Sequence, residues 1–267
     1  MFGAGGGTSS YREIEQTDLI VLWGSNAREA HPIFFHHVLK AVNAGAQLMV
    51  VDPRRTPSAQ WADLWLGLDV GTDIPLANAV AREILEAGLA DMEFIGRATS
   101  GFEAFRESVQ PWTLGEAERV TGVPADAIRE LAHSYGSATN AQLCWTLGIT
   151  EHHNAVDNVF ALINLALLTG KVGKWGSGLQ PLRGQNNVQG GGDMGAIPNK
   201  LPGGQDVADD IARAKFETAW DASFLRTPAC ICPGCSRRWS TASFARCTSS
   251  ARTRPRERRT RRGRNGC

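Results

Sequence analysis

Two short, uninterrupted apolar segments, Leu19–Trp23 and Leu48–Val51, constrain the fold of this chain more than any other feature. Neither segment alternates with polar residues, and each is too short for a buried helix, so both are typical of strands buried on both faces. Between them, Pro32–Ala44 has apolar residues at helical spacing, and Gly45 follows as a residue that ends helices. The order strand, helix, strand indicates parallel strands joined by a crossover helix.

The alternation of strands and helices continues to about residue 170. Two further strands and three helical regions are predicted, with strands at Leu64–Leu68 and Gln142–Leu147 and helices at 73–88, 91–136 and Asn154–Leu168. We therefore expect an α/β domain with a Rossmann-like, mostly parallel sheet and helices on both faces.

Three loops are predicted to follow strands at the carboxyl edge of this sheet: Gly24-Ser25-Asn26, Asp52-Pro53-Arg54-Arg55-Thr56 and Gly71-Thr72-Asp73. In open α/β sheets ligands bind beyond that edge, where backbone N–H groups favour phosphate. The small residues permit close approach to a pyrophosphate, one acid suits ribose hydroxyls, and the other suits the N–H edge of a purine. Taken singly, Asp52 or Asp73 could equally cap a turn or a helix.

The histidines offer a weaker signal than these loops. His31, His36 and His37 lack a matching group of acids or cysteines, so packing or surface roles are favoured over metal binding. His152 and His153 follow a predicted strand and lie nearer the expected nucleotide site. We assign no metal ligand among these residues.

Gly, Asn, Gln and Pro dominate the chain from Lys171 to Gly204, which predicts a long loop of functional importance. Within it, Arg183 can bind a carboxylate through two parallel N–H bonds, while Gln185, Asn186 and Asn187 add neutral donors. The alternative interpretation is a solvated linker.

Charge divides the chain into two segments. Residues 1–225 carry 16 Lys and Arg against 26 Asp and Glu, whereas 226–267 carry 12 Arg against a single acid, Glu257.

No apolar run approaches the roughly 20 residues of a membrane span, and the first residues lack a signal-peptide pattern. We expect no membrane insertion and a cytoplasmic segment, although a longer parent could be periplasmic. Cys144, alone outside the basic tail among six cysteines, is expected in the core.

Several colinear strings resemble the catalytic subunit of molybdopterin-dependent formate dehydrogenases, within the dimethyl-sulfoxide-reductase superfamily. The resemblance extends over residues 2–225. The matching strings are Tyr11–Asp18, Gly24-Ser25-Asn26, His31-Pro32, Val51–Thr56, Gly71-Thr72-Asp73, Leu147–Thr150, Leu168-Thr169-Gly170 and Leu182–Gly190.

This resemblance implies two pterin guanine dinucleotides carrying molybdenum or tungsten, and formate as the substrate. Arg183 would fix the formate carboxylate, with Gln185 beside it. The residues implied in cofactor binding are Gly24, Ser25, Asn26, Asp52, Arg54, Gly71, Asp73, Gly148 and Glu151. Four parts are expected: a loop of a larger domain at 1–10, the dinucleotide-binding domain at 11–180, the active-site loop and the return to a neighbouring domain at 181–225, and a tail at 226–267.

In the family, a Cys or selenocysteine metal ligand and the cysteines of an iron–sulfur cluster precede the stretch that matches residues 2–10. We therefore expect an internal fragment, inactive alone, whose parent holds the cluster and contacts electron-transfer subunits. A nitrate-reductase-like enzyme and a non-catalytic nucleotide-binding module are the alternatives.

The tail suggests a zinc or iron–sulfur site at Cys230, Cys232 and Cys235, or a nucleic-acid-binding arm. A frameshift near Thr227 or Pro228 explains it better. GC-rich codons for Arg238–Thr253, read in a shifted frame, give a string that resembles the family's next strand and loop. We expect a disordered tail that binds neither metal nor nucleic acid.

Overall fold

A computed structural model describes residues 6–223 of the chain. Its main feature is a five-stranded sheet of order β3-β2-β1-β4-β5 in which every neighbouring pair is parallel. The strands are β1 (Leu19–Trp23), β2 (Gln47–Val51), β3 (Leu64–Leu66), β4 (Ala141–Trp145) and β5 (Gly178–Pro181). The four predicted strands and the parallel sheet are confirmed, whereas β5 was not predicted as a strand.

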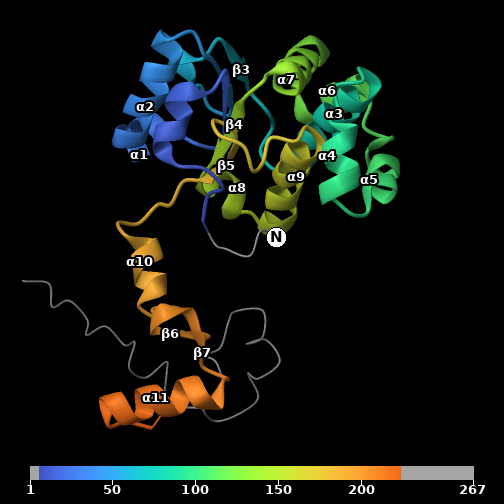
Figure 1. The fold of residues 1–267 in the computed structure, drawn as a ribbon. Coiled ribbons are helices and arrows are strands. Elements are labelled where there is room, and N and C mark those ends of the chain that lie inside the picture. Colours follow the sequence, from blue (N-terminus) through green and yellow to red (C-terminus); the bar gives the residue numbers. More distant parts are fainter. Residues whose placement is uncertain (1–5, 224–267) are drawn as a thin grey trace, which may run out of the picture. The chain divides into compact units, whose positions relative to one another are not determined.

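Helices cover both faces of the sheet, as predicted (Figure 1). On one face lie α3 (Asp73–Glu86), α4 (Met92–Ala98), α5 (Phe102–Val109), α6 (Leu114–Thr121), α7 (Ala125–Ser137) and α9 (Ala155–Leu168). On the other lie η1 (Tyr11–Gln16), α1 (Ala27–Ala30), α2 (Pro32–Asn43) and η2 (Ala59–Trp61). The predicted strand 142–147 is too long, because Leu147 begins the short helix α8 (Leu147–Thr150).

The side chains of β1 show why its sequence is continuously apolar. Leu19, Val21 and Trp23 belong to the core beneath α3, α7 and α9, whereas Ile20 and Leu22 belong to the core beneath α2. All five are at most 1% exposed. Full burial of such a side chain stabilises the fold by about 1.5–3 kcal/mol, so a strand with two buried faces has no position for a polar residue.

The first described residues are held on the edge strand β5. The backbone N–H of Thr8 donates to Leu179 O at 2.9 Å, and the N–H of Leu179 donates to Thr8 Oγ1 at 2.9 Å. A Cβ atom at Gly178 would lie 2.6 Å from the same hydroxyl oxygen. Contacts between distant parts of the sequence therefore fix β5, which explains why its own residues did not predict a strand.

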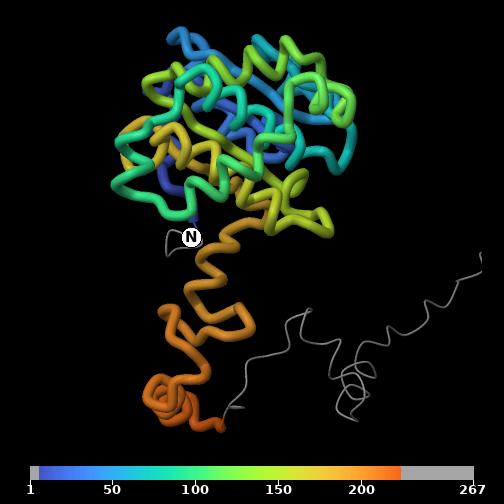
Figure 2. Tube along the Cα trace, turned by 90° about the vertical axis from the view of Figure 1, so that its right-hand side faces the viewer, coloured from blue at the N-terminus to red at the C-terminus, as the bar shows by residue number. Residues whose placement is uncertain are grey.

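Residues 187–223 form a unit of their own, the part of the tube in Figure 2 that runs from amber to red-orange. Its elements are α10 (Val188–Asp193), the antiparallel pair β6 (Lys200–Leu201) and β7 (Gln205–Asp206), η3 (Pro202–Gly204) and α11 (Asp210–Trp220). The segment predicted as a long loop thus contains short regular elements.

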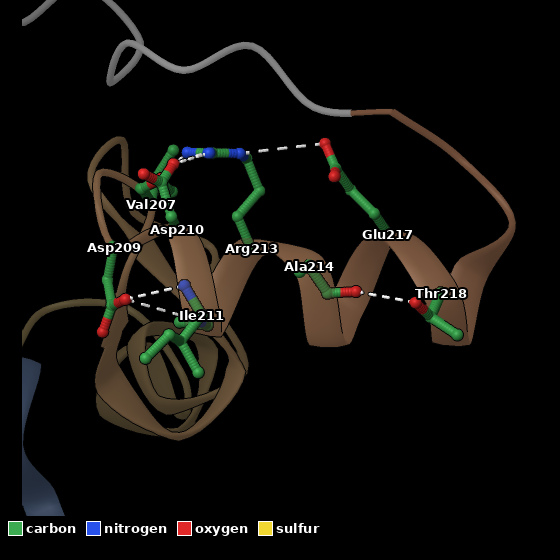
Figure 3. A network of polar contacts seen from close by, with 9 residues as sticks. Val207, Asp209, Asp210, Ile211, Arg213, Ala214, Glu217 and Thr218 are labelled. Carbon is green, nitrogen blue, oxygen red and sulfur yellow. Dashed lines mark hydrogen bonds and ion pairs between the residues drawn. The ribbon is translucent and has the colours of Figure 1, made fainter.

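Polar contacts hold the start of α11 in place (Figure 3). The Asp209 carboxylate caps the helix by accepting from the N–H groups of Ile211 and Ala212, at 2.8 and 3.4 Å. Arg213, only 5% exposed, donates to the carbonyl of Val207 and to the carboxylate of Asp210. These contacts satisfy a buried guanidinium.

Two predictions concern residues outside this description. The described residues do not include residues 1–5, which are half of the expected loop at 1–10. They also do not include the tail at 226–267, with its cysteines and the expected frameshift. Within 6–223, no helix combines the length and apolarity that crossing a membrane requires.

Candidate functional site

A pocket of about 390 Å³ opens at the carboxyl edge of the sheet. The strand order reverses between β1 and β4, because the chain first builds outward through β2 and β3 and then returns to the other side of β1. Such a switch point is the usual ligand site of open α/β sheets. The pocket is lined by residues that follow four strands, namely Gly24, Asn26, Ala30, Val51, Asp52, Pro53, Arg54, Leu68, Val70, Gly71, Asp73, Thr146, Gly148 and His152.

Backbone contacts at Gly24 join three of these loops. Its N–H donates to Val51 O at 2.8 Å, and its carbonyl accepts from the Thr146 hydroxyl at 2.7 Å. Gly24 has a φ of +58°, and a Cβ atom at Gly148 would lie 2.6 Å from Gly24 O. Because only two glycines can approach this closely in this conformation, the rim after β1 and β4 is built from bare backbone.

Asp52 follows β2 and is 7% exposed. Its Oδ1 accepts from the N–H of Arg54 at 2.9 Å, and its carbonyl accepts from the indole of Trp65 at 2.9 Å. Burial raises the pKa of its carboxyl above the usual range, and the N–H and charge of Arg54 partly oppose that rise. The carboxylate is thus a desolvated acceptor.

Asp73 is the first residue of α3 and is also 7% exposed. Its Oδ1 accepts from the indole N–H of Trp23 at 2.9 Å. Burial raises the pKa of the Asp73 carboxyl, while the Trp23 hydrogen bond and the nearby His152 act in the opposite direction. The positive end of the α3 dipole also favours an anion at this position.

Seven of the predicted cofactor-binding residues line this pocket: Gly24, Asn26, Asp52, Arg54, Gly71, Asp73 and Gly148. Ser25 is fully buried beside them, and its hydroxyl has no partner among the described residues. Glu151 is exposed at the end of α8 and is not among the lining residues. Trp23 and Thr146 were not predicted as residues of the site, because their roles arise from contacts with Asp73 and Gly24.

Arg183 and Gln185 are exposed and do not line the pocket. Their loop leaves the same edge of the sheet, because Leu182 N–H donates to Trp145 O at 2.9 Å and its side chain is buried under α2. The carbonyl of Arg183 lies 2.5 Å from His31 Nε2 at the junction of α1 and α2. The Arg183 backbone therefore lies beside the end of α1, the helix that carries pocket residue Ala30.

His36 and His37 do not line the pocket. His37 Nδ1 lies 2.5 Å from Glu15 Oε1, which also accepts from Lys40 at 2.9 Å. His36 is exposed.

Cys144 is fully buried in the core, where burial raises the pKa of its thiol. Among residues 6–223, no three His, Cys, Asp or Glu side chains form a group that could hold a metal ion.

A parallel sheet with a pocket at its switch point places the chain in the class of open α/β domains, in which that point is the usual ligand site. The chain belongs to the molybdopterin oxidoreductase family, whose model matches residues 4–225. Membership implies a molybdopterin cofactor that carries molybdenum or tungsten.

The relatives found in the comparisons agree with this family. The F420-dependent formate dehydrogenase 2 subunit alpha of Methanococcus maripaludis is 42% identical over 84% of this chain and 33% of its own length. Formate dehydrogenase H of Escherichia coli is 41% identical over 84% of this chain and 31% of its own length. The chain therefore spans about a third of the length of these relatives.

A solved structure shares the fold. Acetylene hydratase from Pelobacter acetylenicus aligns with a TM-score of 0.58 and 26% identity, over 64% of this chain and 25% of that chain.

The residues of the pocket fit a phosphate-bearing pterin cofactor. Asp52 and Asp73 line the pocket with acceptor oxygens and are each only 7% exposed. A ligand rich in hydroxyl and N–H groups would donate to these oxygens in a pocket whose rim is glycine backbone.

Proposed function

We propose that this chain is part of the catalytic subunit of an enzyme that oxidises formate to carbon dioxide. The relatives named formate dehydrogenases, at 41–43% identity over 82–84% of the chain, support this activity. The reaction releases one proton and two electrons per formate. When bound, a metal on two pterin guanine dinucleotides would supply this two-electron chemistry, and an iron–sulfur cluster and partner subunits of the whole enzyme would carry the electrons onward.

The pocket after β1 to β4 holds the guanine dinucleotide end of one cofactor molecule in this proposal. Asp52 accepts from ribose hydroxyls, and Asp73 accepts from the N–H edge of guanine, because both are buried acceptors on the rim. The glycines at 24, 71 and 148 allow the pyrophosphate to approach the backbone. Ser25, Asn26, Arg54 and Glu151 complete the binding residues.

Arg183 binds the formate carboxylate in this proposal, and Gln185 lies beside it. A guanidinium forms two parallel, charge-assisted hydrogen bonds with a carboxylate, which fixes both position and orientation. The loop of Arg183 leaves the same edge of the sheet as the pocket loops, since Leu182 N–H pairs with the last residue of β4. The observation that carries the proposal is the match to relatives named formate dehydrogenases of a chain whose acidic and glycine loops meet in one pocket at the edge of the sheet.

A hybrid enzyme tests the proposed activity. Residues 6–223 replace the matching segment of E. coli formate dehydrogenase H, which spans about a third of that protein. We expect the purified hybrid to reduce a viologen dye with formate and to contain molybdopterin guanine dinucleotide. A hybrid that binds the cofactor, ignores formate and instead oxidises reduced dye with nitrate would contradict the proposal.

A further inference from the structure

Trp23 is a tryptophan at the carboxyl end of the central strand, and its indole contacts Asp73, which lines the pocket. It is 1% exposed, and its Nε1 donates to Asp73 Oδ1 over a sequence separation of 50 residues. The Asp73 side chain receives no other side-chain hydrogen bond from the described residues. The indole N–H of Trp23 and the backbone N–H of Asp73 itself therefore orient this carboxylate toward the pocket that it lines.

The indole leaves most of the carboxylate available to a ligand. Each carboxylate oxygen has about two acceptor positions, so after one indole contact both Oδ1 and Oδ2 can still accept. Two oxygens held in one plane match two neighbouring N–H donors. Guanine offers such a pair at N1 and N2, whereas adenine places an acceptor beside its amino group.

We propose that Trp23 is the positioning residue for base recognition: its indole N–H locks the Asp73 carboxylate in the orientation that selects guanine over adenine. The proposal rests on the proposed function, in that it takes the pocket to hold a guanine nucleotide. Trp23 acts through Asp73 and does not itself contact the nucleotide.

The neighbouring strand provides a matched comparison. Trp145 is the residue that pairs with Trp23 in the β1–β4 register, it is 4% exposed, and it belongs to the same core. Its Nε1 has no hydrogen-bond partner among the described residues. Loss of the Trp145 indole therefore removes similar packing without removing a donor to Asp73.

The hydrogen bond also predicts a pH effect. Binding to guanine needs the ionised carboxylate, so affinity is lost as the pH falls through the Asp73 pKa. Burial raises that pKa, and the indole N–H opposes the rise by favouring the anion. The other charged or titratable groups at the pocket, Asp52 and Arg54 after β2 and His152 after α8, are unchanged when Trp23 is replaced.

The test compares Trp23→Phe and Trp145→Phe in the full chain, with GDP, IDP and ADP as probes in calorimetric titrations from pH 4 to 9. We expect Trp23→Phe to weaken GDP binding about tenfold near neutral pH. The pH at which half of the GDP affinity is lost on acidification should rise by about one pH unit. IDP, which lacks the N2 amino group, should lose less, and ADP should bind weakly to every variant. Trp145→Phe should keep the wild-type midpoint and selectivity.

A second measurement separates this inference from the proposed function. A carbon-13 titration of the Asp73 carboxyl in the free chain should show a higher pKa in Trp23→Phe than in Trp145→Phe, with no nucleotide present. If Trp23→Phe does not fold, β-(3-benzothienyl)alanine at position 23 keeps the ring size and lacks the N–H. Equal carboxyl titrations, or equal GDP midpoints, in the two variants would overturn the role of Trp23. A wild-type chain that binds GDP no better than ADP would overturn the guanine site itself.

Discussion

Replacing Arg183 by alanine is expected to lower kcat/KM for formate in the hybrid enzyme by roughly 100- to 1,000-fold. The guanidinium is the proposed partner of the substrate carboxylate, and truncating one member of a charge-assisted pair leaves the other without its counter-charge. Initial rates of formate-dependent dye reduction over a range of formate concentrations measure the effect. Because the Arg183 side chain is exposed, the melting temperature should hardly change.

Two further variants sharpen this prediction. Arg183→Lys keeps the charge but loses the planar pair of donors, so we expect activity between the wild type and the alanine variant. Arg97→Ala removes an exposed arginine on α4, which lies outside the pocket, and should retain wild-type kinetics. Wild-type kcat/KM in Arg183→Ala would show that formate is bound by another group.

Gly148→Ala is expected to reduce the free energy of unfolding by about 1–3 kcal/mol. The added Cβ would lie 2.6 Å from the carbonyl oxygen of Gly24 and 2.7 Å from its Cα. Both atoms belong to backbone that the Val51 and Thr146 hydrogen bonds hold in place, so neither can rotate away as a flexible side chain would. Urea denaturation followed by tryptophan fluorescence measures the loss.

Gly96→Ala is the matched control for this backbone contact. Gly96 lies inside α4, and a Cβ atom there would meet nothing within 4 Å. Alanine is the better helix former, so this variant should be more stable by about 0.5–1 kcal/mol. Unchanged stability in Gly148→Ala would mean that the two loops do not approach as closely as the structure shows.

Local sequence patterns predicted most of the sheet and its helices. Leu19–Trp23 is apolar at every position because both of its faces are buried, and that requirement is visible without knowing the partners. The strand β5 was missed for the opposite reason. Gly178 and Gln180 are poor strand signals, and what fixes them is contact with Thr8 and Ser9, more than 160 residues earlier in the chain.

The pocket was predicted only in part. The loops at Gly24, Asp52 and Gly71 follow strands, and parallel strands bring their carboxyl ends to one edge, so their convergence follows from topology. The contacts of Trp23 with Asp73 and of Thr146 with Gly24 depend on how strands and helices pack. No local pattern indicates such contacts. The proposed roles of Arg183, Gln185 and Glu151 still depend on the family resemblance, since none of them lines the pocket.

Hydrogen exchange of the chain with and without GDP tests the central claim most directly, namely that four strand-end loops form one nucleotide site. We predict that saturating GDP slows exchange in all four loops together, at 24–26, 52–54, 71–73 and 146–148, and that ADP at the same concentration does so far less. The separate pocket around Ile95 and Phe102 should be unaffected. Protection confined to one loop, or found at that second pocket instead, would contradict the account.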